Sequence, residues 1–178
     1  MNLNDIFNSF YDKIYSFTLM RVGNVHDAED IASDVFVKVA EKLDTYKPEK
    51  AAFSTWIFTI ALNDIRKYFR DRKTFYSLDD MFEIVAQFDI EEEFLRRDEL
   101  VCLSHALSEL DEKQREVVHL KYFGELPSRR IAEIMNLSET NVGVILHRSK
   151  IFLKTFLISC KKSSSCVYKN MMREESVR

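Results

Sequence analysis

Glycine and proline are scarce in this chain of 178 residues, which contains three Gly and two Pro. Sandwiches and barrels turn about every 8–12 residues on Gly, Pro and Asn, and doubly wound sheets place Gly in phosphate loops. The shortage argues against both sheet classes and favours an all-α chain. A hydrophobic fraction of 46% can build real cores, so one domain or two small ones are expected rather than bulk disorder.

Signals for membranes, export and disulfides are also missing. No stretch reaches the roughly 18 consecutive apolar residues that a membrane span requires, and the first residues do not read as a signal peptide. Cys102, Cys160 and Cys166 are odd in number and form no C-x-x-C pair, so a disulfide framework is not expected. We therefore expect no membrane insertion and a cytoplasmic location.

Residue patterns typical of catalysis are absent as well. The four histidines are not at zinc-ligand spacing, and the chain has no Gly-rich phosphate loop, G-x-S-x-G element or Cys/His pairing. Acidic pairs such as Asp27 with Asp30, or Asp79 with Asp80, lack the His or Lys companions of a nuclease site. Helix starts and a solvated linker explain them. The sequence predicts no metal, no cofactor and no enzyme.

Charge is strongly segregated beneath a net value of −3. Residues 1–75 contain 11 basic and 11 acidic side chains, residues 76–100 contain 2 and 9, and residues 101–178 contain 13 and 9. This pattern predicts two helical domains joined by an acidic linker. The stretch from Ile65 to Lys73 has five basic residues, one acidic residue and two aromatics, a composition suited to nucleic acid, although a solvated helix end would look similar.

Apolar periodicity predicts three helices in the first half, over about 5–22, 26–43 and 54–71, with Ser54 or Thr55 capping the third. The first helix is expected to bury Ile6, Phe7, Phe10, Ile14, Phe17 and Leu19. Gly23 ends that helix and Pro48 requires a loop before the third. One face of the second helix carries an apolar residue among charges, which hints at a docking surface: Asp30, Asp34, Val37, Lys38 and Glu41.

In the second half, helices are expected over about 92–110 and 112–123, with Asp111 capping the latter. Residues 128–135, the turn at 136–137 and a helix from 139 to about 157, capped by Ser138, have the pattern of a helix-turn-helix. Such a motif places the N-terminal residues of its second helix at base edges, and later residues can reach phosphates. A helical hairpin with no DNA role remains an alternative. The candidate readers are Glu139, Thr140, Asn141 and Val144, followed by His147, Arg148 and Lys150.

Taken together, the two halves resemble extracytoplasmic-function sigma factors, the two-domain specificity subunits of bacterial RNA polymerase. The resemblance covers roughly residues 5–157. In the first half it is carried by Phe10-Tyr11, Arg21 to Asn24, Asp27 to Ile31, Asp34 to Phe36 and Phe53 to Ala61. In the second half it is carried by Ala106 to Leu110, Arg115 to Val118, Ile131 to Ile134 and Leu146 to Lys150.

The resemblance implies roles for both surfaces of the first half. The face of the second helix would bind the clamp helices of the polymerase. The loop after that helix and the third helix would capture the non-template strand of the −10 element, where stacking groups and cations are needed. Trp56 fits a core position equally well. The residues suited to the −10 element are Tyr46, Lys47, Lys50, Phe53, Trp56, Asn63, Arg66, Lys67 and Arg70.

For the −35 element, the resemblance implies contacts from the helix-turn-helix: Arg129, Arg130, Ser138, Glu139, Thr140, Asn141, Val144, His147, Arg148 and Lys150. Two departures stand out. Gly143-Val144-Ile145 occupies positions where the family commonly has Lys-Ser-Arg, and Arg129-Arg130 stands where acidic residues are frequent. We hypothesise that these two arginines bind DNA phosphates in place of the two cations that the recognition helix lacks.

The expected organisation is a sigma-two-like domain at 1–75, an acidic linker at 76–92, a sigma-four-like helix-turn-helix domain at 93–160 and a polar tail at 161–178. The linker would either thread the polymerase as an RNA mimic or act as a solvated spacer. Expected partners are core RNA polymerase, through its clamp helices and flap, promoter DNA and an anti-sigma factor. The alternatives are a stand-alone helix-turn-helix regulator and a structural adaptor.

Overall fold

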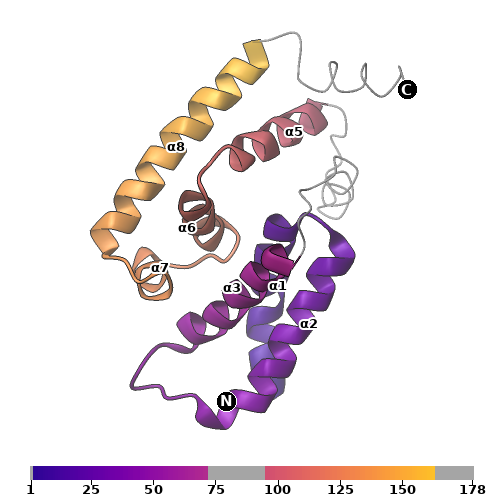
Figure 1. Ribbon diagram of the computed structural model, residues 1–178, viewed down its shortest axis with the longest axis vertical. Coiled ribbons are helices and arrows are strands. Elements are labelled where there is room, and N and C mark those ends of the chain that lie inside the picture. The colour runs from indigo at the N-terminus through magenta and orange to yellow at the C-terminus, as the bar shows by residue number, and fades with distance from the viewer. Residues whose placement is uncertain (1, 72–94, 163–178) are drawn as a thin grey trace.

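A computed structural model describes residues 2–71 and 95–162, and this part of the chain forms seven α-helices and one short 3₁₀ helix in two domains (Figure 1). The all-α, two-domain expectation is confirmed. The predicted linker at 76–92 and residues 163–178 of the predicted tail lie outside the described residues.

The first domain is a bundle of α1 (Leu3–Val22), α2 (Val25–Lys42), η1 (Leu43–Thr45) and α3 (Phe53–Asp71). Gly23 ends α1 with a left-handed backbone at φ 72°, as the sequence predicts. The expected cap of α3 is wrong, because the helix already begins at Phe53 and the Trp56 amide donates to the carbonyl of Ala52. Thr55 therefore has no capping role, and its hydroxyl is used elsewhere.

The core of this domain is built by one face of each helix. Ile14 and Phe17 of α1 are fully buried against α2 and α3, and the Phe17 and Phe58 rings meet edge to face with centroids 5.5 Å apart. Phe7 was expected in this core, but it is 45% exposed and stacks instead on Tyr11, with ring centroids 4.6 Å apart. The helical period alone could not place Phe7, because it lies at the margin of the apolar stripe.

The second domain consists of α5 (Leu95–Ser108), α6 (Glu112–Tyr122), α7 (Ser128–Met135) and α8 (Glu139–Lys162). The predicted helix-turn-helix is confirmed in α7 and α8: Asn136 turns the chain at φ 52°, and Ser138 Oγ accepts the Asn141 amide at 3.1 Å. Asp111 caps α6 in a capping box. The last helix runs to Lys162, past the expected end near 157, since residues 158–162 contain neither Gly nor Pro.

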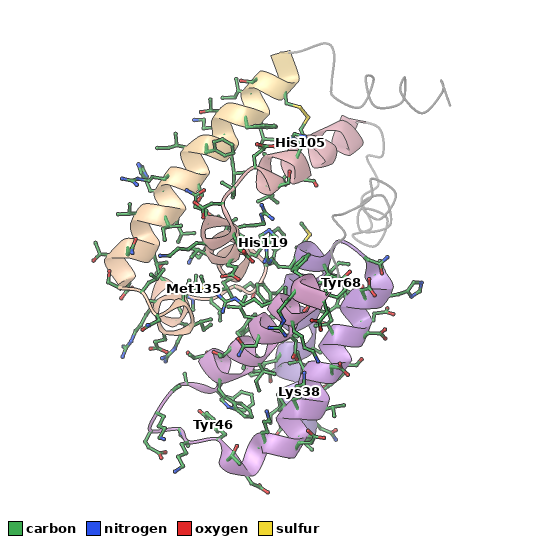
Figure 2. The ribbon with its side chains drawn as sticks, in the orientation of Figure 1. Lys38, Tyr46, Tyr68, His105, His119 and Met135 are labelled. Atoms are coloured by element: carbon green, nitrogen blue, oxygen red, sulfur yellow. A yellow bond between two sulfur atoms is a disulfide. The ribbon has the colours of Figure 1, made fainter. Side chains whose placement is uncertain are left out.

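A disulfide joins Cys102 of α5 to Cys160 of α8, with Cα atoms 6.4 Å apart, and Figure 2 draws it as a yellow bond between these helices. The expectation of no disulfide was therefore wrong. The two cysteines are 58 residues apart in sequence, and only the packing of α5 along α8 brings them together.

The two domains pack against each other through α3 on α7 and α1 on α6, which we call the closed arrangement. One apolar cluster runs through both, from residues of α1, α2 and α3 to Leu120, Leu126, Ile131 and Val142. Gly124 sits directly on Phe58 of α3: a Cβ on this glycine would lie 2.8 Å from the ring and 2.9 Å from the Leu120 carbonyl. Glycine at this position permits the close approach.

Candidate nucleic-acid interface

An aromatic cluster forms where the loop after α2 meets the start of α3. Tyr46 lies 5.1 Å from Phe53 and 5.3 Å from Trp56 between ring centroids, and Phe53 and Trp56 are 5.4 Å apart. The Tyr46 hydroxyl donates to the Ala51 carbonyl at 3.0 Å, which ties the loop back onto itself. All three rings are half-buried, so each is partly core and partly accessible to a stacked base. Figure 2 shows Tyr46 at the lower end of the first domain.

Cations and an amide surround this cluster and continue along the exposed side of α3. These side chains are exposed: Lys47, Lys50, Asn63, Arg66, Lys67 and Arg70. Arg70 Nε lies 3.6 Å from Asp71 Oδ1, an exposed pair that contributes little to stability. Aromatic rings flanked by cations on one helix are suited to a single-stranded nucleic acid, because bases stack on the rings while phosphates meet the charges.

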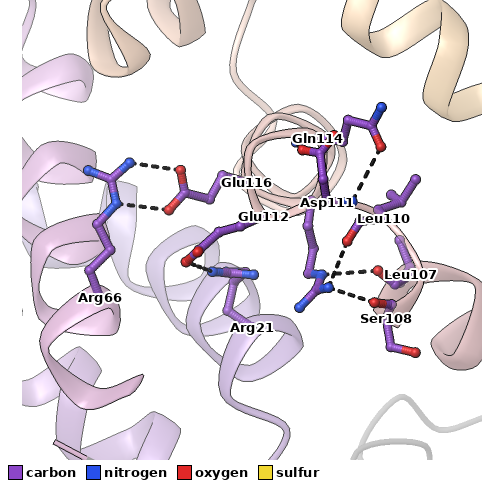
Figure 3. A network of polar contacts seen from close by, with 10 residues as sticks. Arg21, Arg66, Leu107, Ser108, Leu110, Asp111, Glu112, Gln114 and Glu116 are labelled. Carbon is purple, nitrogen blue, oxygen red and sulfur yellow. Dashed lines mark hydrogen bonds and ion pairs between the residues drawn. The ribbon is translucent and has the colours of Figure 1, made fainter. Parts of the chain in front are cut away.

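Arg66 is distinct from the other cations because a carboxylate of the second domain holds it. Its Nε and Nη2 donate to the two oxygens of Glu116 at 2.8 and 2.7 Å (Figure 3). The hydrogen bond to Glu116 raises the pKa of Arg66. The Glu116 side chain is 3% exposed and that of Arg66 is 45% exposed. Arg66 therefore makes a bidentate bond within the chain, using the two N–H groups with which a guanidinium can also bind a phosphate.

The start of α8 presents the predicted readers to solvent. These residues are exposed on the helix-turn-helix: Ser138, Glu139, Thr140, Asn141, Val144, His147, Arg148 and Lys150. Val142 and Ser149 point inward and are buried, which fixes the rotation of the helix. Gly143 is exposed and no atom lies within 4 Å of the position a Cβ would take, so internal packing does not require glycine there.

Glu133 of α7 connects the helix-turn-helix to the first domain. One of its oxygens accepts the Thr55 hydroxyl of α3 at 2.7 Å, and Arg130 Nη1 donates to both oxygens at 2.8 and 3.0 Å. Arg129 Nε lies 3.7 Å away. The hydrogen bond from Thr55 and the neighbouring guanidinium groups lower the pKa of Glu133. The two arginines expected at phosphates are thus paired with Glu133, although the Arg129 side chain stays 76% exposed.

The predicted docking face on α2 is largely free in the described structure. Asp30, Asp34 and Glu41 are exposed, and Val37 is 55% exposed on the same face. Lys38 is the exception, because its Nζ pairs with Asp64 of α3 at 2.5 Å and is half-buried. A row of carboxylates around an exposed apolar side chain is suited to a basic, partly apolar partner.

Sequence reasoning did not find Thr55, Glu116 and Glu133 as functional residues. Their partners lie 78, 50 and 3 residues away, so the first two depend wholly on domain packing. The sequence offered one signal, Glu116 in an amphipathic helix, and a lone carboxylate is ordinarily solvated.

Within the described ranges 2–71 and 95–162, no three His, Cys, Asp or Glu side chains gather as a metal site would require. Among the same residues, none of the helices combines the length and apolar character needed to cross a membrane.

Both halves of the chain match a family model. Residues 6–75 match Sigma-70 region 2 and residues 100–153 match Sigma-70 region 4. The chain is 33% identical over 161 residues to the ECF RNA polymerase sigma factor SigW of Bacillus subtilis, covering 84% of this chain and 86% of that protein.

Two solved structures share the fold. One is CnrH in complex with the cytosolic domain of CnrY, with a TM-score of 0.66 and 22% identity, covering 88% of each chain. The other is the sigma factor RpoE in complex with the anti-sigma factor NepR from Bartonella quintana, with a TM-score of 0.65 and 18% identity. That match covers 86% of this chain and 95% of the other.

Proposed function

Because the chain belongs to the extracytoplasmic-function sigma factors, which direct RNA polymerase to promoters, we propose that its two domains divide promoter recognition between them. The domain at 1–75 binds the polymerase clamp and the −10 element. The domain at 93–160 binds the polymerase flap and the −35 element. The chain does no catalysis of its own, and the polymerase supplies the chemistry in the cytoplasm.

At the −10 element, the aromatic cluster of Tyr46, Phe53 and Trp56 carries the proposal. Its rings are half-buried, so they offer faces to an extruded base while remaining anchored in the domain. Extruding a base costs a few kcal/mol, and stacking on an aromatic ring returns about 1–3 kcal/mol. The exposed cations of α3 hold the backbone of the displaced strand. The cluster and the cations together promote DNA opening.

At the −35 element, the exposed first turns of α8 enter the major groove. Thr140 and Asn141 contact base edges, while His147, Arg148 and Lys150 lie farther along the helix and reach phosphates. Glycine at 143 removes a side chain on the same exposed side, so the backbone of α8 can approach the groove closely.

The carboxylate face of α2 is proposed as the contact for the clamp helices, with Val37 as its apolar centre. Both solved relatives of this fold carry a bound protein, and the RpoE structure names it as an anti-sigma factor. We extend this to the present chain: an anti-sigma factor is expected to cover surfaces that the polymerase needs.

The closed arrangement restrains both DNA surfaces at once. Arg66 is held by Glu116 of the other domain, and Arg130 is held by Glu133, which also accepts Thr55. A promoter phosphate must compete with these carboxylates. We propose that the domains separate when the polymerase binds, which breaks the Arg66–Glu116 pair and the Thr55–Glu133 hydrogen bond and releases Arg66 to the DNA, while Arg130 stays paired with Glu133 within α7 until a phosphate displaces it.

A binding experiment with core polymerase tests the division of labour. Lys67→Ala should weaken binding to a non-template −10 strand and leave a −35 duplex unaffected, whereas Asn141→Ala should do the reverse. Lys113→Ala, which removes an exposed cation from α6 outside both surfaces, is the matched control. Equal losses on both DNA fragments for all three variants would reject the assignment, and binding without polymerase would favour a stand-alone regulator.

A further inference from the structure

Neither promoter recognition nor polymerase binding uses the cysteines. The disulfide between Cys102 and Cys160 lies in the second domain, and Cys160 stands near the end of α8, far along the helix from the readers at its start. Their Cα separation of 6.4 Å falls within the usual range of about 4.4–6.8 Å for disulfides. The backbone of α5 and α8 is thus already placed for the bond.

We propose that Cys102 and Cys160 are a reversible thiol–disulfide pair that clamps α5 onto the distal end of α8. In a compartment that keeps thiols reduced, such disulfides are commonly transient rather than structural. A regulatory role for this pair therefore rests on the cytoplasmic location given under the proposed function. The chemistry of the pair does not depend on that location.

The C-terminal end and the middle of α5 are held by different means. At its C-terminal end, the Arg115 guanidinium donates to the carbonyls of Leu107, Ser108 and Leu110 at 3.1, 2.6 and 2.7 Å (Figure 3). Farther toward the N-terminus, the disulfide at Cys102 is the covalent tie to α8. Reduction leaves these hydrogen bonds intact and removes the covalent tie at Cys102, in the middle of α5.

Noncovalent contacts between α5 and α8 also lie near the disulfide. The His105 and Phe156 rings stack with centroids 5.7 Å apart, and Leu103 and Leu153 join a small apolar cluster with buried Leu107 and Leu110. On the same distal part of α8, Ile151 and Ile158 remain 54% and 46% exposed. The covalent bond adds to these contacts in holding α5 to α8.

Burial sets the order of the reaction. Cys102 is 7% exposed and Cys160 is half-buried, so the Cys160 thiolate meets an external disulfide of the glutathione class first. It bonds to one glutathione sulfur, the external S–S bond breaks, and a glutathione thiolate leaves with the electron pair. The Cys102 thiolate then attacks the Cys160 sulfur and expels the second thiolate. Two protein thiols thereby give two electrons and two protons to one external disulfide.

The test equilibrates the reduced full chain with mixtures of reduced and oxidised glutathione, alkylates the remaining thiols and maps the peptides by mass spectrometry. Of the three thiols in the chain, two should be lost and one retained, with a cross-link between the Cys102 and Cys160 peptides. The oxidised form should melt at a temperature at least about 5 °C higher than the reduced form.

Variants separate this pair from other thiol reactions. Cys166→Ser is the matched control and should keep both the cross-link and the melting shift. Cys160→Ser should lose both and form no mixed disulfide at the buried Cys102, and its half-buried place in α8 should leave the circular dichroism spectrum unchanged. A cross-link that contains Cys166, a disulfide between two chains, or full retention of three thiols in excess oxidised glutathione would each overturn the proposal.

Discussion

The ion pair between Arg66 and Glu116 gives a sharp test of the closed arrangement. Replacing Glu116 by Gln keeps the size and hydrogen-bonding reach of the side chain but removes its charge. The matched control is Glu112→Gln, which makes the same charge change on the same helix. The Glu112 side chain is 71% exposed and lies 3.9 Å from Arg21, so its contact contributes little.

The magnitude follows from the geometry. Two charge-assisted hydrogen bonds of 2.7 and 2.8 Å join the groups, and each such bond is worth about 1.5–3 kcal/mol when shielded from water. The Arg66 side chain is 45% exposed, so solvent screening reduces this value, and Gln retains part of the hydrogen bonding. The closed arrangement should therefore lose about 1–2 kcal/mol, a factor of about 5–30 in the equilibrium between closed and open forms.

Fluorescence anisotropy with core polymerase and a labelled −10 non-template strand measures the consequence. Glu116→Gln should bind about 5–30-fold more tightly than the wild type, and small-angle scattering should show a larger radius of gyration. Glu112→Gln should stay within about twofold, and adding Arg66→Ala to Glu116→Gln should abolish the gain. If the two glutamate variants bind equally and neither expands the molecule, Glu116 does not restrain Arg66 and the reasoning is wrong.

Four further predictions follow from the packing and charges. Gly124→Ala forces a Cβ onto Phe58 and should expand the molecule in small-angle scattering while helical circular dichroism is retained. Burial and two nearby guanidinium groups hold the pKa of His119 well below its usual value. As the pH falls, the unfolded chain therefore binds the proton first, and the free energy of unfolding should decrease below about pH 6.5 by up to about 1.4 kcal/mol per pH unit. His119→Gln should flatten that slope in urea titrations. Arg129→Ala should weaken holoenzyme binding to a −35 duplex for all sequences alike and reduce the salt slope by about one, whereas an unchanged slope would remove the arginine from the phosphate contacts. Gly143→Ala should raise the free energy of unfolding by up to about 1 kcal/mol, and a loss of stability would contradict the open space around that position.

Features that depend on a single turn of chain were predictable from the sequence. Asp111 and Ser138 begin helices because their side chains accept hydrogen bonds from backbone amides, and Gly23 ends a helix because it has no side chain. All three lie where the sequence predicts. The helix-turn-helix was equally predictable, since Ile131 and Ala132 are buried as its core requires.

Features that depend on tertiary packing were not predictable in this way. In the sequence, Arg66 is one of several cations on α3, and no neighbouring residue indicates that it pairs with a carboxylate 50 residues away. The same holds for Cys102 and Cys160, whose partnership needs two helices to lie side by side. Thr55 looked like a helix cap because a hydroxyl near a helix start usually serves there, but the helix starts earlier and the hydroxyl binds Glu133.

Run-off transcription tests the central claim most directly. Core RNA polymerase is incubated with promoter fragments selected from genomic DNA, with and without this protein. Transcripts from defined start sites are expected only when both are present, and they should be strongly reduced by Lys67→Ala and by Asn141→Ala but not by Lys113→Ala. Promoter binding by the protein alone, with no stimulation of the polymerase on any fragment, would contradict it.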